Sequence, residues 1–320
     1  MFKWAQKVFN QIKYNSGGNY TIPQNFLDNY FDNFIRQNNW MPWDDQRNIS
    51  NKPEYDSWYN WYPSDTILKF EENKRTSPEL LKKFGWMTND GNPTEIQYWI
   101  NDWGFRCKNF SDKPGIAFFG CSMTFGVGLS EKDTFAYQVA SHYNLENYNM
   151  GMPGKGLDFT ALFALLKLPK LCPNLKAICI YLPPPGRRSI VTKITDADKN
   201  AATPYNYINL HALDYMHEDY LGDKNPGISH NELITNTPST EAIYLNWLWR
   251  DENLLYNEIS ALAVYKTLAN DLGIPLVIIN QQDASWFPEH SDLARDLLHP
   301  GKTNNKLIAE QFLLQLELDK

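Results

Sequence analysis

Three residues of the types that form a nucleophilic triad stand in two short segments of the second half of the chain. Ser122 lies in Gly120-Cys121-Ser122, and Asp296 and His299 lie in the segment that ends with Pro300-Gly301. A serine hydroxyl becomes a nucleophile when an imidazole takes its proton, and a carboxylate can hold that imidazole in the correct tautomer. Because Asp296 and His299 are three positions apart, they can meet on a loop while His299 Nε2 stays free for Ser122.

The residues before Ser122 predict where its hydroxyl lies. An apolar run over residues 116–119 reads as a strand, and an amphipathic helix is expected after Gly-Cys-Ser. Such a turn exposes a hydroxyl and directs backbone N–H groups toward a bound ligand. A structural alternative is that Ser122 only caps the helix. The corresponding alternative for Asp296 and His299 is a capping turn before the last helix.

Short apolar runs alternate with helical patterns from Pro114 onward. The expected strands cover residues 116–119, 146–150, 177–182 and 275–280, and the expected helices lie near 134–143, 157–168, 252–272 and 303–316. This alternation is typical of βαβ units and predicts a short, mostly parallel sheet in a three-layer α/β/α domain. Ligands of such sheets bind at the carboxyl ends of the strands, and the segments with Ser122 and His299 both follow expected strands.

Two regions depart from this pattern. Residues 1–113 are polar and aromatic-rich, with eight of the eleven tryptophans, and we expect an irregular extension that packs on a catalytic domain of residues 114–320. A second stretch, about residues 187–246, follows Pro183-Pro184-Pro185-Gly186 and is expected to be an irregular insertion over the site. A loop of that length is either functional or has structure of its own.

Composition excludes several classes of protein. The 320 residues are 42% apolar, enough for a full core, and the net charge of −7 leaves no basic footprint for nucleic acid. The cysteines lack the spacing of a zinc site or disulfide framework; they are Cys107, Cys121, Cys172 and Cys179. No signal peptide or apolar run of about 18 residues is seen, so we expect a cytoplasmic or virion-associated protein without a membrane partner.

Taken together, these motifs resemble the SGNH (GDSL-type) hydrolase superfamily. Its first block is a strand followed by Gly-Asp-Ser or a variant, and its last is Asp-x-x-His, commonly before Pro-Gly. The family's second block matches residues 149–154, Asn-Met-Gly-Met-Pro-Gly, and implies that Gly154 N–H and Ser122 N–H form the oxyanion hole. An Asn-x-x-Gly-Phe-Arg motif common in the family matches residues 101–106. The resemblance implies a flavodoxin-like fold.

Gly151 and Gly154 also have a structural alternative to a role in the oxyanion hole. Both could be present only because they form a turn with positive φ.

The chain departs from the family pattern at two places. Cys121 stands where the family has aspartate, which leaves the serine geometry intact. The family's oxyanion asparagine after the third strand is absent, because residues 183–188 read Pro-Pro-Pro-Gly-Arg-Arg. Gly186 N–H or a guanidinium of Arg187 or Arg188 is a candidate replacement, and either arginine is a candidate for binding a negatively charged substrate group.

The function implied by the resemblance is hydrolysis of a short acyl ester, for example an acetyl ester, on a small molecule or a glycan, with no cofactor. The alternatives are an acyltransferase with the same triad, a lipase, and a non-catalytic glycan-binding or virion structural protein. The lipase is disfavoured, because the sequence shows no extended apolar segment that could form a lid. The tryptophans fit sugar stacking or core packing. A metal site in the insertion is disfavoured because the spacing matches no ligand template; its residues would be His211, Asp214, His217, Glu218, Asp219 and His230. Oligomeric state is not encoded in these patterns.

Overall fold

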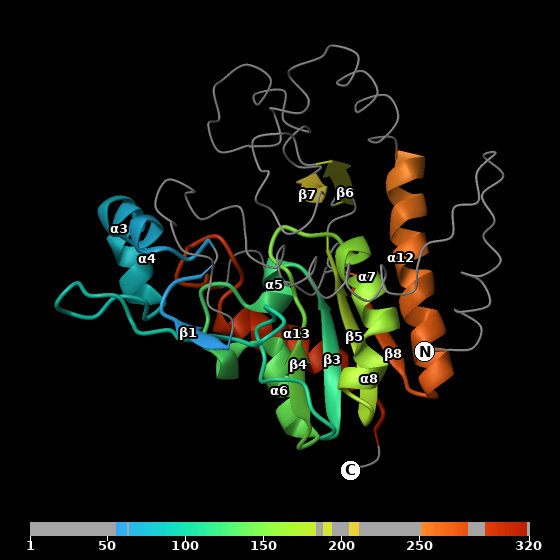
Figure 1. Ribbon diagram of the computed structural model, residues 1–320. Helices are drawn as coiled ribbons and strands as arrows, with labels where there is room; N and C mark the ends of the chain where they lie inside the picture. The colour runs from blue at the N-terminus through green and yellow to red at the C-terminus, as the bar shows by residue number, and fades with distance from the viewer. Residues whose placement is uncertain are drawn as a thin grey trace.

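The computed structural model describes residues 56–62, 64–183, 188–193, 205–210, 251–280 and 292–318 (Figure 1). Its centre is a mixed α/β unit around a four-stranded sheet of order β4-β3-β5-β8. The strands are β3 (Gly115–Gly120), β4 (Glu146–Asn149), β5 (Leu175–Leu182) and β8 (Leu276–Asn280). All three pairings are parallel, so the residues that follow the strands converge at one edge of the sheet.

Strand β3 is buried along its whole length, because helices cover both faces of the sheet. Alternate side chains point to opposite faces: Ala117 and Phe119 belong to one apolar cluster, and Ile116 and Phe118 to another. The first cluster includes residues of α7 (Leu157–Leu166) and α12 (Asp251–Leu272). The second includes residues of α6 (Phe135–His142) and α13 (Lys302–Gln315). Figure 1 shows these helices on both sides of the strands.

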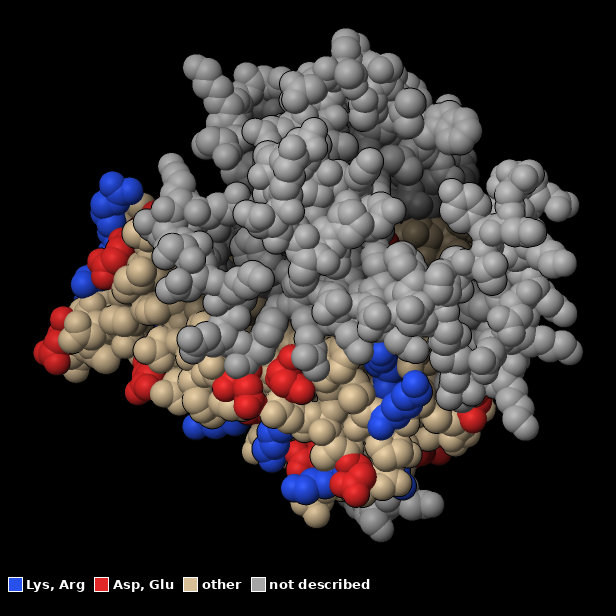
Figure 2. Space-filling view, viewed as in Figure 1, with Lys and Arg blue, Asp and Glu red and all other residues tan. Residues whose placement is uncertain are grey.

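Short elements complete the α/β unit. Helix α5 (Ser122–Phe125) follows β3, a 3₁₀ turn η1 (Glu131–Asp133) precedes α6, and α8 (Leu168–Leu171) follows α7. In the described part of the chain, no helix combines the length and apolar character needed to cross a bilayer. Basic and acidic side chains are interspersed on the face seen in Figure 2, without a large patch of one sign in its described part.

The segment before the sheet is more regular than expected. Strands β1 (Ser57–Tyr59) and β2 (Tyr98–Ile100) pair antiparallel. The helices α3 (Ile67–Thr76) and α4 (Pro78–Lys83) come between these two strands in the sequence. The expectation of an irregular region is therefore wrong for residues 56–113. Thr66 caps α3 by accepting the Lys69 N–H, and a proline starts α4. Both helices are short and largely polar, so their apolar periodicity is weak.

The insertion also contains regular structure. Strands β6 (Arg188–Lys193) and β7 (Tyr205–Leu210) form an antiparallel pair, so a wholly irregular insertion is the wrong expectation. Their alternating sequences are too short and too polar to be distinguished from a loop without the pairing partner. In Figure 1 this pair lies beyond the end of the sheet at which α5 begins. The remaining parts of the insertion lie outside the described residues.

A buried ion pair ties the first segment to the end of the chain. Arg295 Nη2 lies 2.6 Å from Asp65 Oδ2, and Arg295 Nε donates to Asp65 Oδ1 at 3.0 Å. Both side chains are at most 2% exposed. The Tyr98 hydroxyl donates to Asp65 at 2.6 Å and accepts the Gly128 N–H at 2.9 Å. The segment beside Asp296 is thus fixed against a residue 230 positions earlier in the chain.

We expect Arg295→Met to lower the free energy of unfolding by about 3–5 kcal/mol, because it leaves the Asp65 carboxylate buried without its cation. Equilibrium urea denaturation measures the loss. Lys69→Met is the control, since it breaks the partly exposed pair of Lys69 with Glu72 and should cost about 0–1 kcal/mol. Equal losses in the two variants would contradict a stabilising role for the Asp65 pair.

Candidate active site

Ser122 is the first residue of helix α5, directly after the end of β3. Gly120 has φ +151°, and a Cβ there would lie 2.2 Å from Thr124 Oγ1 and 2.5 Å from the Tyr181 carbonyl oxygen, so only glycine fits this turn. Cys121 occupies the N-cap position, and no side chain caps the helix. Ser122 therefore does not serve as the helix cap. Its side chain is mostly buried, with the residue 7% exposed.

Asp296 and His299 form the predicted pair. His299 Nδ1 lies 2.5 Å from Asp296 Oδ2, and the other carboxylate oxygen accepts the N–H groups of Leu298 and His299 at 3.1 Å. Between them Leu297 adopts φ +56°, a left-handed conformation that is unfavourable for a side chain of this size. Because of this turn, one oxygen of the Asp296 carboxylate contacts His299 Nδ1 while the other accepts two backbone N–H groups. His299 Nε2 remains available for another group.

The environment of Asp296 keeps its carboxylate ionised. Burial by itself raises the pKa of Asp296, but the neighbouring His299 charge and the hydrogen bonds from His299 and Leu298 outweigh that effect and lower it below the usual value. A buried carboxylate held in this way orients the imidazole and stabilises its protonated form.

A different aspartate caps the last helix. Asp292 accepts the N–H groups of Thr303 at 2.7 Å and Asn304 at 3.2 Å, at the start of α13. The capping alternative for Asp296 and His299 therefore does not hold. Sequence analysis missed Asp292, because Asp292 lies too far from the helix start in the sequence for the usual capping spacing to reveal it.

Backbone contacts bring the Ser122 and Asp296 segments together. Arg295 N–H donates to the Gly128 carbonyl at 3.0 Å, and a Cβ on Gly128, which has φ +72°, would lie 2.8 Å from Arg295 N. Asn73 of α3 donates to the Asp296 carbonyl oxygen at 2.8 Å. The turn after α5 and the loop carrying the Asp296–His299 pair are thus in direct contact.

Arg106, the last residue of the Asn-x-x-Gly-Phe-Arg motif, holds that turn from the other side. Its guanidinium donates to the carbonyl oxygens of Phe125 at 3.0 Å and of Gly126 and Leu129 at 2.6 Å each. It lies 4.3 Å from the ring centroid of Tyr98 and is 2% exposed. These bonds satisfy the carbonyl groups at the end of α5, so Arg106 positions the helix that begins with Ser122.

The loop after β4 lies against the same helix. Met152 N–H donates to the Gly120 carbonyl at 2.9 Å, and Asn149 donates to the Thr124 carbonyl at 2.7 Å while accepting the Gly151 N–H. A Cβ on Gly151 would lie 2.3 Å from Phe125 N, so glycine is required for close approach rather than for positive φ. Gly154 does adopt positive φ, at +75°. Within the described residues, neither Gly154 N–H nor Ser122 N–H donates a hydrogen bond.

Other candidate residues fall largely outside the described chain. The candidate Arg187 is one of them, because residues 184–187 are not described. Arg188, at the start of β6, is described only as the backbone partner of Leu210. The six metal candidates of the insertion also lie outside the described residues, and the described part holds no cluster of metal-ligating side chains. Trp86 and Trp103 are core residues, whereas Trp58 is 59% exposed and contacts Trp99.

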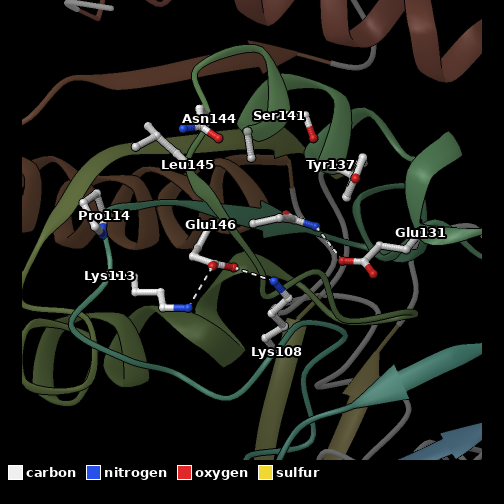
Figure 3. A pocket seen from close by; sticks show the side chains of 11 residues that line it. Lys108, Lys113, Pro114, Glu131, Tyr137, Ser141, Asn144, Leu145 and Glu146 are labelled. Carbon is white, nitrogen blue, oxygen red and sulfur yellow. Dashed lines mark hydrogen bonds and ion pairs between the residues drawn. The ribbon is translucent and has the colours of Figure 1, made fainter.

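A cavity of about 580 Å³ lies at the other end of the sheet, where β3 and β4 begin. Figure 3 shows Lys108 and Lys113 directed toward Glu146 in this cavity, with amino nitrogens 3.2 and 3.7 Å from its carboxylate oxygens. Its position at the amino ends of the strands separates it from Ser122 and His299. We therefore do not assign it to the candidate site.

No protein-family model matches this chain, and no curated protein matches its sequence significantly.

The lowered pKa of Asp296 predicts a pH-dependent loss of stability that Asp296→Asn should remove. A carboxylate with a folded-state pKa below its unfolded value stabilises the fold above about pH 4 and loses that contribution as pH falls through the folded-state pKa. Denaturation of both proteins at intervals from pH 7 to pH 3 should show their stabilities converging in acid. A constant difference across that range would show that the Asp296 charge does not stabilise the fold.

Proposed function

We propose that this chain is a serine ester hydrolase of the SGNH type, with Ser122 as nucleophile, His299 as base and Asp296 as the group that orients the base. The observation that carries the proposal is the 2.5 Å contact between Asp296 Oδ2 and His299 Nδ1, in a loop bonded to the turn that follows Ser122. The strand order β4-β3-β5-β8 is second, first, third, fourth along the chain, which supports the flavodoxin-like arrangement.

The proposed reaction is acyl transfer in two steps. His299 Nε2 takes the Ser122 proton as Oγ attacks the ester carbonyl carbon, and then gives that proton to the departing alcohol as the C–O bond breaks. Water, deprotonated by His299, next attacks the acyl-enzyme and releases the acid. In the described residues neither Ser122 Oγ nor His299 Nε2 has a hydrogen-bond partner, and such catalytic bonds often tighten only when substrate binds.

Two backbone N–H groups are proposed to stabilise the oxyanion. Ser122 N–H is at the start of α5 and Gly154 N–H is in the loop bonded to Gly120 through Met152, and both are without acceptors in the described chain. Donors of this kind act on the charge that develops in the transition state. The family resemblance supports a short acyl group, such as acetyl, and a carbohydrate as a candidate alcohol.

A fluorophosphonate probe tests the nucleophile without knowledge of the natural substrate. We expect covalent labelling of Ser122, its loss in Ser122→Ala, and labelling slowed on the order of 10⁴-fold in Asp296→Asn, which leaves the imidazole in the wrong tautomer. Peptide mass spectrometry identifies the modified serine. Ser141→Ala, in an exposed position on α6, is the control and should label as the wild type does. A wild-type protein that stays unlabelled would rule the proposal out.

Gly154→Ala tests the oxyanion donor. The φ of +75° is strained for alanine, so the change should shift the N–H and lower the rate of 4-nitrophenyl acetate hydrolysis by about 10²–10³-fold. Gly273→Ala is a matched control, because Gly273 has φ +64° and no heavy atom within 4 Å of an added Cβ. Both variants should lose similar stability, but only the first should lose rate. Equal rates would remove Gly154 from the mechanism.

A further inference from the structure

Lys155 is a buried lysine in the loop beside Ser122. It follows Gly154 directly, and its backbone N–H donates to the Met152 carbonyl at 3.1 Å, in a turn whose Met152 N–H is bonded to Gly120. The residue is 2% exposed. Lysine is rarely buried to this extent unless a partner compensates its charge.

That partner is absent from the described residues. In the described part of the chain the Lys155 ammonium lies over the Phe159 ring, with Nζ 4.0 Å from its centroid, and no hydrogen bond or ion pair to a described residue reaches Nζ. Burial lowers the pKa of Lys155 to about 7, against an opposing effect of Asp158. The negative charge of Asp158 only partly offsets the effect of burial on Lys155, and Asp158 Oδ1 accepts the Phe159 N–H at 3.0 Å.

Tyr265 of α12, whose hydroxyl lies 3.3 Å from the Leu157 carbonyl oxygen, does not supply a counter-charge. The Tyr265 hydroxyl is hydrogen-bonded to Thr160 at 2.7 Å, and burial raises the pKa of Tyr265, so the phenol stays neutral. A buried ammonium without an acceptor is costly, whereas the same ammonium paired with an anion is not. Among the described residues, no hydrogen-bonded anion balances the Lys155 charge.

The start of α7 adds to the positive potential at this point. Lys155 immediately precedes Gly156, the N-cap of this ten-residue helix, and no side chain caps it. The N-terminal end of a helix attracts anions through its unpaired N–H groups and its dipole. Asp158 in the first turn offsets part of this potential.

We propose that Lys155 and the start of α7 bind a negatively charged oxygen of the substrate, so that the ester cleaved at Ser122 belongs to an acidic molecule carrying a carboxylate or phosphate group. The choice of an ester rests on the proposed function, whereas the anion site rests on Lys155 itself. The hydrogen bond from Met152 to Gly120 and the close approach of Gly151 to Phe125 hold this loop against α5. The anion thus binds on the loop that also carries the candidate oxyanion donor Gly154.

The anion site can be tested by following Lys155 with NMR of ¹³Cε-labelled lysine, assigned by the signal lost in Lys155→Met. Acetate, inorganic phosphate, D-galacturonate and, as the neutral control, D-galactose are titrated at pH 6 and constant ionic strength. We expect an anion to shift the Lys155 signal and raise its pKa, and D-galactose to leave both unchanged. The acetate and galacturonate arms report a carboxylate site, and the phosphate arm a phosphate site.

The same anions should bind Lys155→Met about ten- to a hundred-fold more weakly, because a charge-assisted hydrogen bond is lost. Isothermal titration calorimetry measures the affinity of each anion. Two variants are controls: Lys155→Arg keeps the positive charge at this position, and Lys176→Met removes an exposed charge on β5. Affinity for wild type should fall as pH rises above about 7, where the free amine loses its proton. Methionine leaves no buried charge, so Lys155→Met should fold, as its thermal melt will report.

The outcomes separate this proposal from the previous one. Anion binding that depends on Lys155 and persists in Ser122→Ala, without fluorophosphonate labelling of wild type, would keep the anion site and reject the hydrolase. Labelling of Ser122 with no anion shifting Lys155, or with equal anion binding by Lys155→Met, would keep the hydrolase and overturn the anion site.

Discussion

The close contact between Gly128 and the backbone at Arg295 is the constraint on which the candidate site depends. A side chain at Gly128 would collide with Arg295 N and Ala294 Cβ, so the turn after α5 can touch the Asp296 loop only through glycine. The partners around this contact are each buried and each bonded to backbone: Arg106 holds the α5 turn, Tyr98 holds Gly128 N–H, and Asn73 holds the Asp296 carbonyl. The first hundred residues therefore contribute directly to the geometry of a site whose candidate catalytic groups come later in the chain.

Local patterns in the sequence predicted the parts of the molecule that local physics determines. The apolar run ending at Gly120 predicted β3 and placed Ser122 at the start of a helix, and the Asp-x-x-His spacing predicted the bond between Asp296 and His299. Contacts set by tertiary packing were missed. Neither the pairing of Asp65 with Arg295 nor the burial of Lys155 follows from periodicity, because each depends on which segments the fold brings together.

Asp296 and Lys155 face the same electrostatic problem with different outcomes. Each carries a charge that burial disfavours. Asp296 gains an imidazole and two backbone N–H groups from its own loop, whereas Lys155 gains only an aromatic ring in the described chain. A carboxylate compensated from within is a fixed part of the site. An ammonium left uncompensated makes the electrostatics of the site depend on what binds there.

The Asp65–Arg295 pair also bears on when the site can form during synthesis. Its two partners are 230 residues apart, and Arg295 immediately precedes Asp296. At about 5–20 residues per second, a ribosome needs on the order of 10–50 s to extend the chain from one partner to the other. The β1–β2 segment and the first βα units can fold during that interval, but the carboxylate of Asp65 has no guanidinium partner until Arg295 emerges. Completion of the candidate site therefore comes late in the order of synthesis, because the segment that carries Arg295, Asp296 and His299 must first have left the ribosome.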